Sequence, residues 1–260
     1  MNKINQLFVT RGERKLLSLY FCAGCPTLES TTGIIRTLDR RGIDMVEVGI
    51  PFSDPLADGP VIQTASTIAL RNGMTLATLF GQLRSLDMNE IRMPIVLMGY
   101  LNVVMHYGIE RFCESCAASG VSGAIIPDLP FADYMDYVKP IADRHNLRII
   151  MMITPETSEE RIHFIDEHTD GFIYMVSSAS ITGAQQSFDD AKQQYFRHIN
   201  GMGLRNPRMI GFGISNKQTL ESARQNAAGA IIGSKFVTLL NENNGDADKA
   251  LDALYDCLSK

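Results

Sequence analysis

Short apolar runs recur along the chain, and each is followed by a stretch in which apolar residues return at helical spacing. The predicted strands are residues 17–24, 44–50, 94–100, 123–128, 148–154, 171–177, 208–213 and 230–233. Helices are predicted at residues 31–41, 61–72, 109–119, 133–145, 159–168, 189–200 and 217–226. Strands that alternate with helices in this way pair in parallel, with each helix crossing over between two strands.

Eight such repeats in 260 residues favour a closed (β/α)8 barrel over an open doubly wound sheet. The chain shows no linker, low-complexity tract or shift in composition, and 45% of its residues are hydrophobic. We therefore predict an α/β protein with one TIM barrel domain over residues 1–260. In such barrels the chemistry lies at the C-terminal ends of the strands and in the loops that follow them.

Glu47 interrupts the apolar run that follows Asp44 in the strand predicted at residues 44–50. Because strand side chains alternate, Met45 and Glu47 share one face, and Val46 and Val48 share the other. The all-apolar face should meet the helices, which leaves Glu47 pointing into the barrel. Burial there should raise the pKa of its carboxyl group toward the range of a general acid or base. The alternative is a structural glutamate paired with a cation, but no basic residue lies on the upper half of a neighbouring predicted strand.

The loop after this strand holds two aspartates whose roles the local sequence leaves open. Asp58 precedes Gly59 and Pro60, where the next helix starts, so it is either a catalytic partner of Glu47 or a helix-capping residue. Asp54 lies in a Ser-Asp-Pro turn and has the same ambiguity.

Two glycine-containing loops follow the seventh and eighth predicted strands, at residues 211–215 and 229–234, and each leads into a helix. Glycine lets the backbone approach an oxyanion, and the free N–H groups at a helix start can hold it. Two such loops at these strand ends favour a phosphate site, although they could also be ordinary turns. Lys235 is expected to point to solvent.

The composition limits the partners and the compartment. The net charge is −5, the isoelectric point is near 5.6 and no basic tract occurs, so nucleic acid and anionic membrane surfaces are not expected partners. No segment approaches the roughly 18 apolar residues of a membrane span. We therefore expect a cytoplasmic protein.

Two C-x-x-C pairs, Cys22/Cys25 and Cys113/Cys116, are compatible with a zinc site. The pairs lie almost ninety residues apart on different predicted elements, and Cys257 is left over. Reduced structural thiols are the favoured interpretation. The five histidines form no ligand pattern, so we assign no metal.

The stretch from Glu47 to Gln63 resembles the signature of the tryptophan synthase α subunit family. Further motifs agree in order, namely residues 127–130, 182–183, 211–215 and 229–234, so that the resemblance covers essentially the whole chain. It implies a (β/α)8 barrel that splits indole-3-glycerol phosphate into indole and glyceraldehyde 3-phosphate without a cofactor.

The resemblance also implies the roles of individual residues. Glu47 would protonate C3 of the indole and then help to remove the glycerol hydroxyl proton, and Asp58 would accept a hydrogen bond from the indole N–H. The backbone of Gly183, Gly213 and Gly233, with Ser234, would hold the phosphate. The implied indole pocket and lid comprise Phe21, Met98, Tyr100, Ile125, Tyr174 and Thr182, the last closing over Asp58.

The lid departs from the family pattern. The family usually has Gly-Val-Thr-Gly, often with an arginine shortly before it, whereas this chain has Ser180 at the first position and Ser178 in place of the arginine. This difference should alter the closure of the lid rather than the reaction.

The implied partner is a pyridoxal-phosphate β subunit, in a heterotetramer of two α and two β chains. Pyridoxal phosphate is expected only in that partner. Two other functions remain open: a stand-alone indole-3-glycerol-phosphate lyase, and a catalytically silent allosteric partner of a β subunit.

Overall fold

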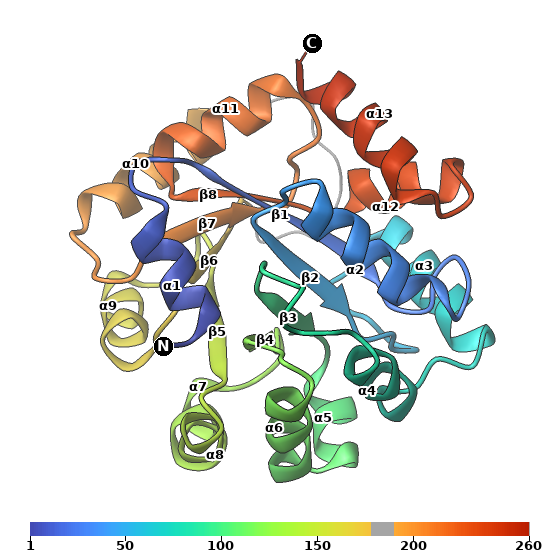
Figure 1. The fold of residues 1–260 in the computed structure, drawn as a ribbon. Helices are drawn as coiled ribbons and strands as arrows, with labels where there is room; N and C mark the ends of the chain where they lie inside the picture. Colours follow the sequence, from blue (N-terminus) through green and yellow to red (C-terminus); the bar gives the residue numbers. More distant parts are fainter. Residues whose placement is uncertain (178–189, 260) are drawn as a thin grey trace.

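The computed structural model describes residues 1–177 and 190–259. Parallel strands close into a barrel in sequence order, each strand pairing with the next and β8 with β1 (Figure 1). The strands are β1 (Leu16–Cys22), β2 (Met45–Gly49), β3 (Ile95–Met98), β4 (Gly123–Ile125), β5 (Arg148–Ile153), β6 (Ile173–Val176), β7 (Arg208–Gly211) and β8 (Gly229–Ile232). The predicted (β/α)8 barrel is confirmed, and the strands fall within one or two residues of most of the predicted limits.

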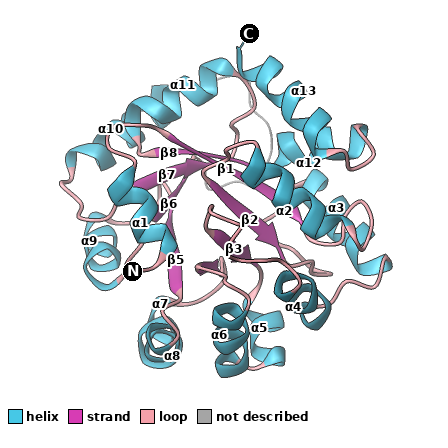
Figure 2. Cartoon of the chain, in the orientation of Figure 1, coloured by secondary structure: helices cyan, strands magenta, loops and turns pink. Residues whose placement is uncertain are grey.

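Helices other than α1 surround the barrel as an outer ring (Figure 2). The helices of the described residues are α1 (Lys3–Thr10), α2 (Ser30–Arg40), α3 (Pro60–Arg71), α4 (Leu76–Arg84), α5 (Leu101–Tyr107), α6 (Ile109–Ala118), α7 (Phe131–Asp133), η1 (Tyr134–Val138), α8 (Lys139–Arg144), α9 (Glu159–His168), α10 (Asp190–Gly201), α11 (Lys217–Asn226), α12 (Ser234–Glu242) and α13 (Ala247–Ser259). Sequence periodicity did not predict α1, α4, α5 or α13.

The single helix predicted at residues 133–145 forms as three consecutive pieces, with the π-helical turn η1 between α7 and α8. Pro140 lies in the first turn of α8. Proline has no N–H to donate to the preceding turn, so a regular α-helical ladder is interrupted at this point.

The apolar core has two layers. The outer layer lies between the strands and the helices and contains Val46 and Val48. The inner layer fills the barrel and contains Met45. The faces of β2 are therefore those that the alternation of its side chains predicts.

Helix α1 fills the N-terminal end of the barrel. Ile4 is fully buried and belongs to the inner layer. The side chain of Asn2 caps the helix by accepting from the backbone N–H of Ile4, and it donates to the carbonyl oxygens of Ser122 at 2.8 Å and Asn146 at 2.7 Å. These bonds tie the start of the chain to the residues that enter β4 and β5.

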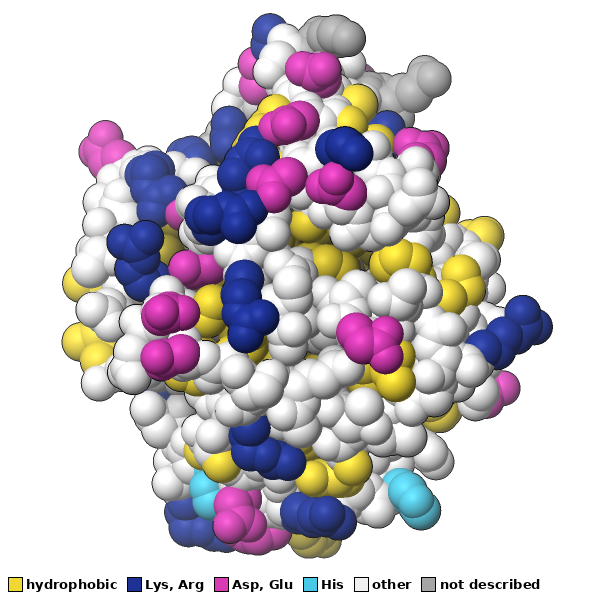
Figure 3. All heavy atoms as spheres, turned by 45° about the vertical axis from the view of Figure 1, so that its right-hand side comes forward, with side chains coloured by type: hydrophobic (Ala, Val, Ile, Leu, Met, Phe, Trp, Pro, Cys, Tyr) yellow, Lys and Arg dark blue, Asp and Glu magenta, His cyan; other side chains and the backbone are white. Residues whose placement is uncertain are grey.

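Charged side chains of both signs mix on the face shown in Figure 3. Ion pairs join α2 to α13, where Arg40 and Arg41 contact Asp248, and Arg41 also contacts Asp252. No helix within residues 1–177 and 190–259 is long and apolar enough to cross a membrane. All five cysteines are free thiols, and four of them are buried.

The Ile4→Ala variant should lower the free energy of unfolding by about 2–5 kcal/mol, because it leaves a cavity at the closed end of the barrel. Val9→Ala is the matched control on the same helix, since Val9 is 72% exposed. It should change stability by less than about 0.5 kcal/mol. Urea unfolding of both variants measures the difference, and equal losses would show that α1 does not seal the barrel.

Candidate active site

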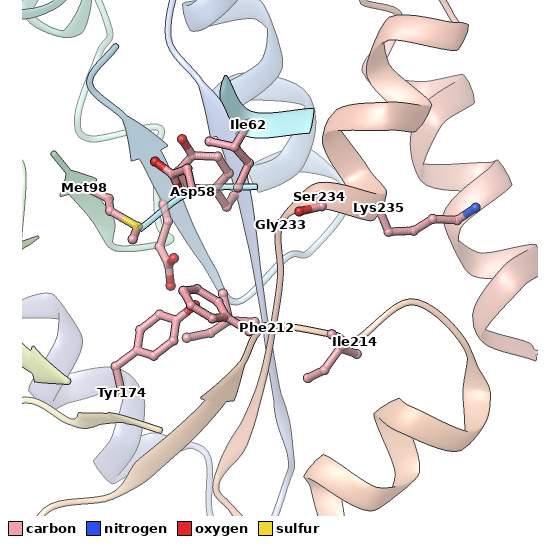
Figure 4. A pocket seen from close by; sticks show the side chains of 13 residues that line it. Asp58, Ile62, Met98, Tyr174, Phe212, Ile214, Gly233, Ser234 and Lys235 are labelled. Carbon is pink, nitrogen blue, oxygen red and sulfur yellow. The ribbon is translucent and has the colours of Figure 1, made fainter. Parts of the chain in front are cut away.

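A cavity with about 430 Å³ of empty space lies at the C-terminal mouth of the barrel (Figure 4). Its walls come from strand ends and the loops that follow them, and they comprise Tyr20, Glu47, Asp58, Ile62, Met98, Tyr174, Phe212, Gly213, Ile214, Ile231, Gly233, Ser234 and Lys235. Both candidate carboxylates thus border one cavity.

Glu47 lies on β2 opposite Tyr20 of β1 and Val96 of β3, and its side chain is fully buried. One carboxyl oxygen, Oε1, accepts a long hydrogen bond of 3.4 Å from Ser18 Oγ. The other, Oε2, has no hydrogen-bond partner among the described residues. Burial raises the pKa of Glu47 to about 8, and the bond from Ser18 opposes this only weakly. Near neutral pH the group is therefore mostly protonated and can donate its proton.

Asp58 lies in the loop between β2 and α3, and only 7% of it is exposed. Tyr100 Oη donates to Asp58 Oδ2 at 2.9 Å and accepts from the backbone N–H of Ala57 at 3.0 Å. Burial raises the pKa of Asp58 to about 6, while the hydrogen bond from Tyr100 lowers it. The carboxyl group is mostly ionised near neutral pH.

The helix-capping alternative for Asp58 does not agree with this geometry. The N-cap residue of α3 is Gly59, and no side chain caps that helix among the described residues. The loop is held instead by its backbone, because Asp58 O accepts from Gln63 Nε2 at 2.7 Å and Asp58 N donates to Pro55 O at 3.1 Å. The carboxylate of Asp58 is left to face Tyr100 and the cavity.

Two tyrosines reach into the mouth because two glycines give them room. A side chain at Gly49 would place its Cβ 2.1 Å from Tyr20 Oη. A Cβ atom at Gly211 would lie 2.1 Å from Tyr174 Oη. The width of the cavity therefore depends on residues that carry no side chain.

The loops after β7 and β8 border the same cavity. Gly213 has a positive φ of 78°, a conformation that suits glycine. Helix α12 begins at Ser234, and its N-cap residue Gly233 provides no side-chain cap. By contrast, α11 is capped by Asn216 and Thr219. Figure 4 shows the side chain of Lys235 running away from the cavity, as predicted.

Most predicted site residues within the described part of the chain converge. Glu47, Asp58, Met98 and Tyr174 line the cavity, as do Gly213, Gly233 and Ser234. Tyr100 contacts Asp58 and lines an adjoining recess. The predictions for Thr182 and Gly183, and for the altered lid positions Ser178 and Ser180, lie outside the described residues.

Two predicted pocket residues lie elsewhere. Phe21 packs in the outer core layer, because neighbouring side chains of a strand face opposite sides, and Tyr20 lines the cavity in its place. Ile125 belongs to the inner layer of the barrel and does not border the cavity.

Sequence reasoning missed four apolar wall residues, Ile62, Phe212, Ile214 and Ile231. Of these four residues, Phe212 could most readily have been predicted from the sequence, because it stands between the two glycines of a loop already chosen as a site. Ile62 lies in the first turn of α3, next to the Asp58 loop, where a side chain can face the mouth.

A closed eight-stranded barrel with two buried carboxyl groups in a cavity at its C-terminal mouth defines a (β/α)8-barrel enzyme. The sequence matches the family model described as tryptophan synthase alpha chain over residues 8–259. The chain belongs to this family.

Its relatives are similar over their whole length. The tryptophan synthase alpha chain of Phocaeicola vulgatus is 63% identical over 258 residues, which are 99% of each chain. That of Parabacteroides distasonis is 62% identical over 260 residues, which are 100% of each chain. The crystal structure of tryptophan synthase subunit alpha from Legionella pneumophila has a TM-score of 0.87 at 29% identity, covering 100% of this chain and 99% of that one.

The protonation of Glu47 should make stability depend on pH. Its pKa is near 4.5 as an unperturbed group and about 8 in the folded protein, so the folded state binds more protons between these values. The free energy of unfolding should therefore fall as pH rises, by up to about 1.4 kcal/mol per pH unit between about pH 5 and 8. Urea unfolding measures this slope against Glu47→Gln, which should lack it. Parallel slopes in the two proteins would refute the shifted pKa.

Tyr100→Phe should raise the pKa of Asp58 further above about 6, because the ionised carboxylate loses the hydrogen bond that stabilises it. Tyr107→Phe serves as the control, since Tyr107 pairs with Ser115 instead. Carbon-13 NMR of labelled aspartate reads the titration directly. An unchanged Asp58 titration in Tyr100→Phe would contradict the assigned bond.

Proposed function

We propose that this chain catalyses the retro-aldol cleavage of indole-3-glycerol phosphate to indole and glyceraldehyde 3-phosphate, as a carbon–carbon lyase. One observation carries the proposal: Glu47 and Asp58 border the same cavity and hold opposite protonation states near neutral pH. The reaction requires an acid for the ring carbon and an anion for the charge that then develops on the ring.

Glu47 begins the reaction by giving its proton to C3 of the indole. The ring nitrogen becomes positively charged, and its N–H donates to the carboxylate of Asp58. The ionised Glu47 then removes the proton from the hydroxyl group on the glycerol carbon bound to C3. The bond between that carbon and C3 breaks, its electron pair returns to the ring, and the carbon leaves as the aldehyde of glyceraldehyde 3-phosphate. Glu47 ends protonated, ready for another cycle.

The remaining cavity residues would hold the two ends of the substrate. The backbone of Gly213 and Gly233 with the hydroxyl group of Ser234 would bind the phosphate at the uncapped start of α12. Met98 and Tyr174 offer apolar walls for the indole ring. Gly183 as a further phosphate ligand and Thr182 as a closing residue stay predictions.

We further propose that the chain needs no cofactor and works with a β subunit. Acid and base roles are both supplied by Glu47, and pyridoxal phosphate is expected only in the partner. The α and β chains would form a complex of two copies of each. The loop that carries Asp58 also carries Leu56, whose side chain is 87% exposed. Leu56 precedes Asp58 by two positions, so a partner that covers Leu56 would contact the same loop as the catalytic carboxylate.

Glu47→Gln and Asp58→Asn should each lower the rate of indole release by about 10²–10⁴-fold. The first variant removes the group that transfers the proton, and the second removes the negative charge that stabilises the indole nitrogen. Asp54→Asn is the matched control on the same loop, and it should leave the rate of the isolated chain unchanged. Chromatography of released indole measures all three. A Glu47→Gln variant that cleaves as fast as the unaltered chain would overturn the assignment.

Adding a β subunit separates the alternatives. We expect a low rate for the chain alone and strong activation by the partner. A high rate without partner would identify a stand-alone lyase. Binding to the β subunit with no indole release in either condition would identify a catalytically silent partner.

A further inference from the structure

Three cations meet in a cleft at the N-terminal end of the barrel, on the face opposite the mouth. Arg11 and Lys15 come from the segment between α1 and β1, and Arg208 is the first residue of β7. The cleft has about 440 Å³ of empty space, and its other lining residues are neutral: Asn200, Pro207, Gln225, Asn226, Ala227 and Ala228.

Neutral acceptors hold these cations in place. Lys15 Nζ donates to Ala227 O at 2.8 Å. The guanidinium group of Arg208 donates to Asn206 O at 3.1 Å and Asn200 Oδ1 at 2.9 Å. Carbonyl and amide oxygens orient a cation without cancelling its charge. Elsewhere on this acidic chain the arrangement differs, because cations such as Arg41 are paired with carboxylates.

One donor of Arg208 is unused. Arg208 Nε is buried and has no hydrogen-bond partner among the described residues. Because Nε is closed to solvent, an anion in the cleft would bind the outer N–H groups of the guanidinium group instead. Such a group can receive an oxyanion, because its donors lie in one plane and match the spacing of the anion's oxygens.

Nearby acidic groups offset the charge of the cleft only in part. Burial lowers the pKa of Lys15, and repulsion by Arg11 and Arg208 lowers it further, while Glu13 only opposes this. Asp166 attracts Arg208, and its carboxylate keeps its charge while it accepts hydrogen bonds from the backbone N–H groups of residues 205 and 206. Three cations against these two carboxylates leave a net positive charge, which an external anion would balance.

We propose that this cleft is a second anion site, which binds a small molecule bearing a phosphate group. Arg11, Lys15 and Arg208 would share the phosphate oxygens. The site is separate from the mouth, since the four residues of β7 and of β8 span about 13 Å between the two faces. The same two strands lead into Gly213 and Gly233, so an anion bound here would lie at the opposite ends of the elements that carry the phosphate loops.

NMR of the complete, nitrogen-15-labelled chain tests the proposal and reports each face separately. Titration with inorganic phosphate, at an ionic strength kept constant with potassium chloride, should shift the Arg208 Nε–H signal and the amide signals of Ala227 and Ala228. These shifts should saturate. Signals of Gly213 and Gly233 report on the mouth independently, so failure of one site does not hide the other.

The double variant Arg11→Gln/Lys15→Gln should weaken binding in the cleft by at least about tenfold, while the Gly213 and Gly233 shifts persist. The control variant Arg36→Gln/Arg84→Gln removes the same charge from exposed positions outside the cleft. It should change neither the binding in the cleft nor the shifts of Gly213 and Gly233. Native-like spectra of both variants would show that they fold. Cleft shifts that fail to saturate, or that are equal in the two double variants, would overturn the proposal.

A second titration with glycerol 3-phosphate identifies the source of the phosphate group. Tighter binding than that of inorganic phosphate supports an organic phosphate as ligand, and equal affinity supports the free ion. Shifts confined to Gly213 and Gly233 with either probe would leave the mouth site standing and refute the cleft site.

Discussion

The burial of one carboxyl group, that of Glu47, is the constraint on which the rest of the structure depends. An ionised carboxylate without water or a cation is costly, so the group is held mostly in its neutral form. The same apolar inner layer that stabilises the barrel therefore prepares an acid. Helix α1 closes the opposite end and completes the apolar surroundings. Fold stability and acid strength are two results of one packing arrangement.

Asp58 complements Glu47 because it is slightly less buried and receives a stronger hydrogen bond. Both groups are largely removed from solvent, but only Asp58 receives a strong hydrogen bond, from Tyr100 at 2.9 Å. Tyr100 also holds the backbone of Ala57, so it fixes the loop and the charge state together. A short polar contact and a smaller degree of burial together distinguish the two carboxyl groups.

The sequence predicted the barrel and the face of Glu47 because β2 carries one polar residue that marks its inward side. The same signal was present in β1 but was not used: Ser18 shares a face with Tyr20 and donates to Glu47, whereas the chosen Phe21 lies on the other face. The role of Asp58 was open locally because its partner Tyr100 lies 42 residues away. Helix α1 escaped prediction because it is short and its anchors, Ser122 and Asn146, are remote in the chain.

The two close glycine–tyrosine approaches limit how this mouth can change during evolution. Any side chain at Gly49 collides with Tyr20, and any at Gly211 collides with Tyr174. A lineage that reshapes the cavity must therefore shorten the tyrosine before the glycine can be replaced, because the reverse order passes through a clashing intermediate. Each pair should vary jointly or stay fixed, so the route to a new substrate is ordered in time as well as restricted in space.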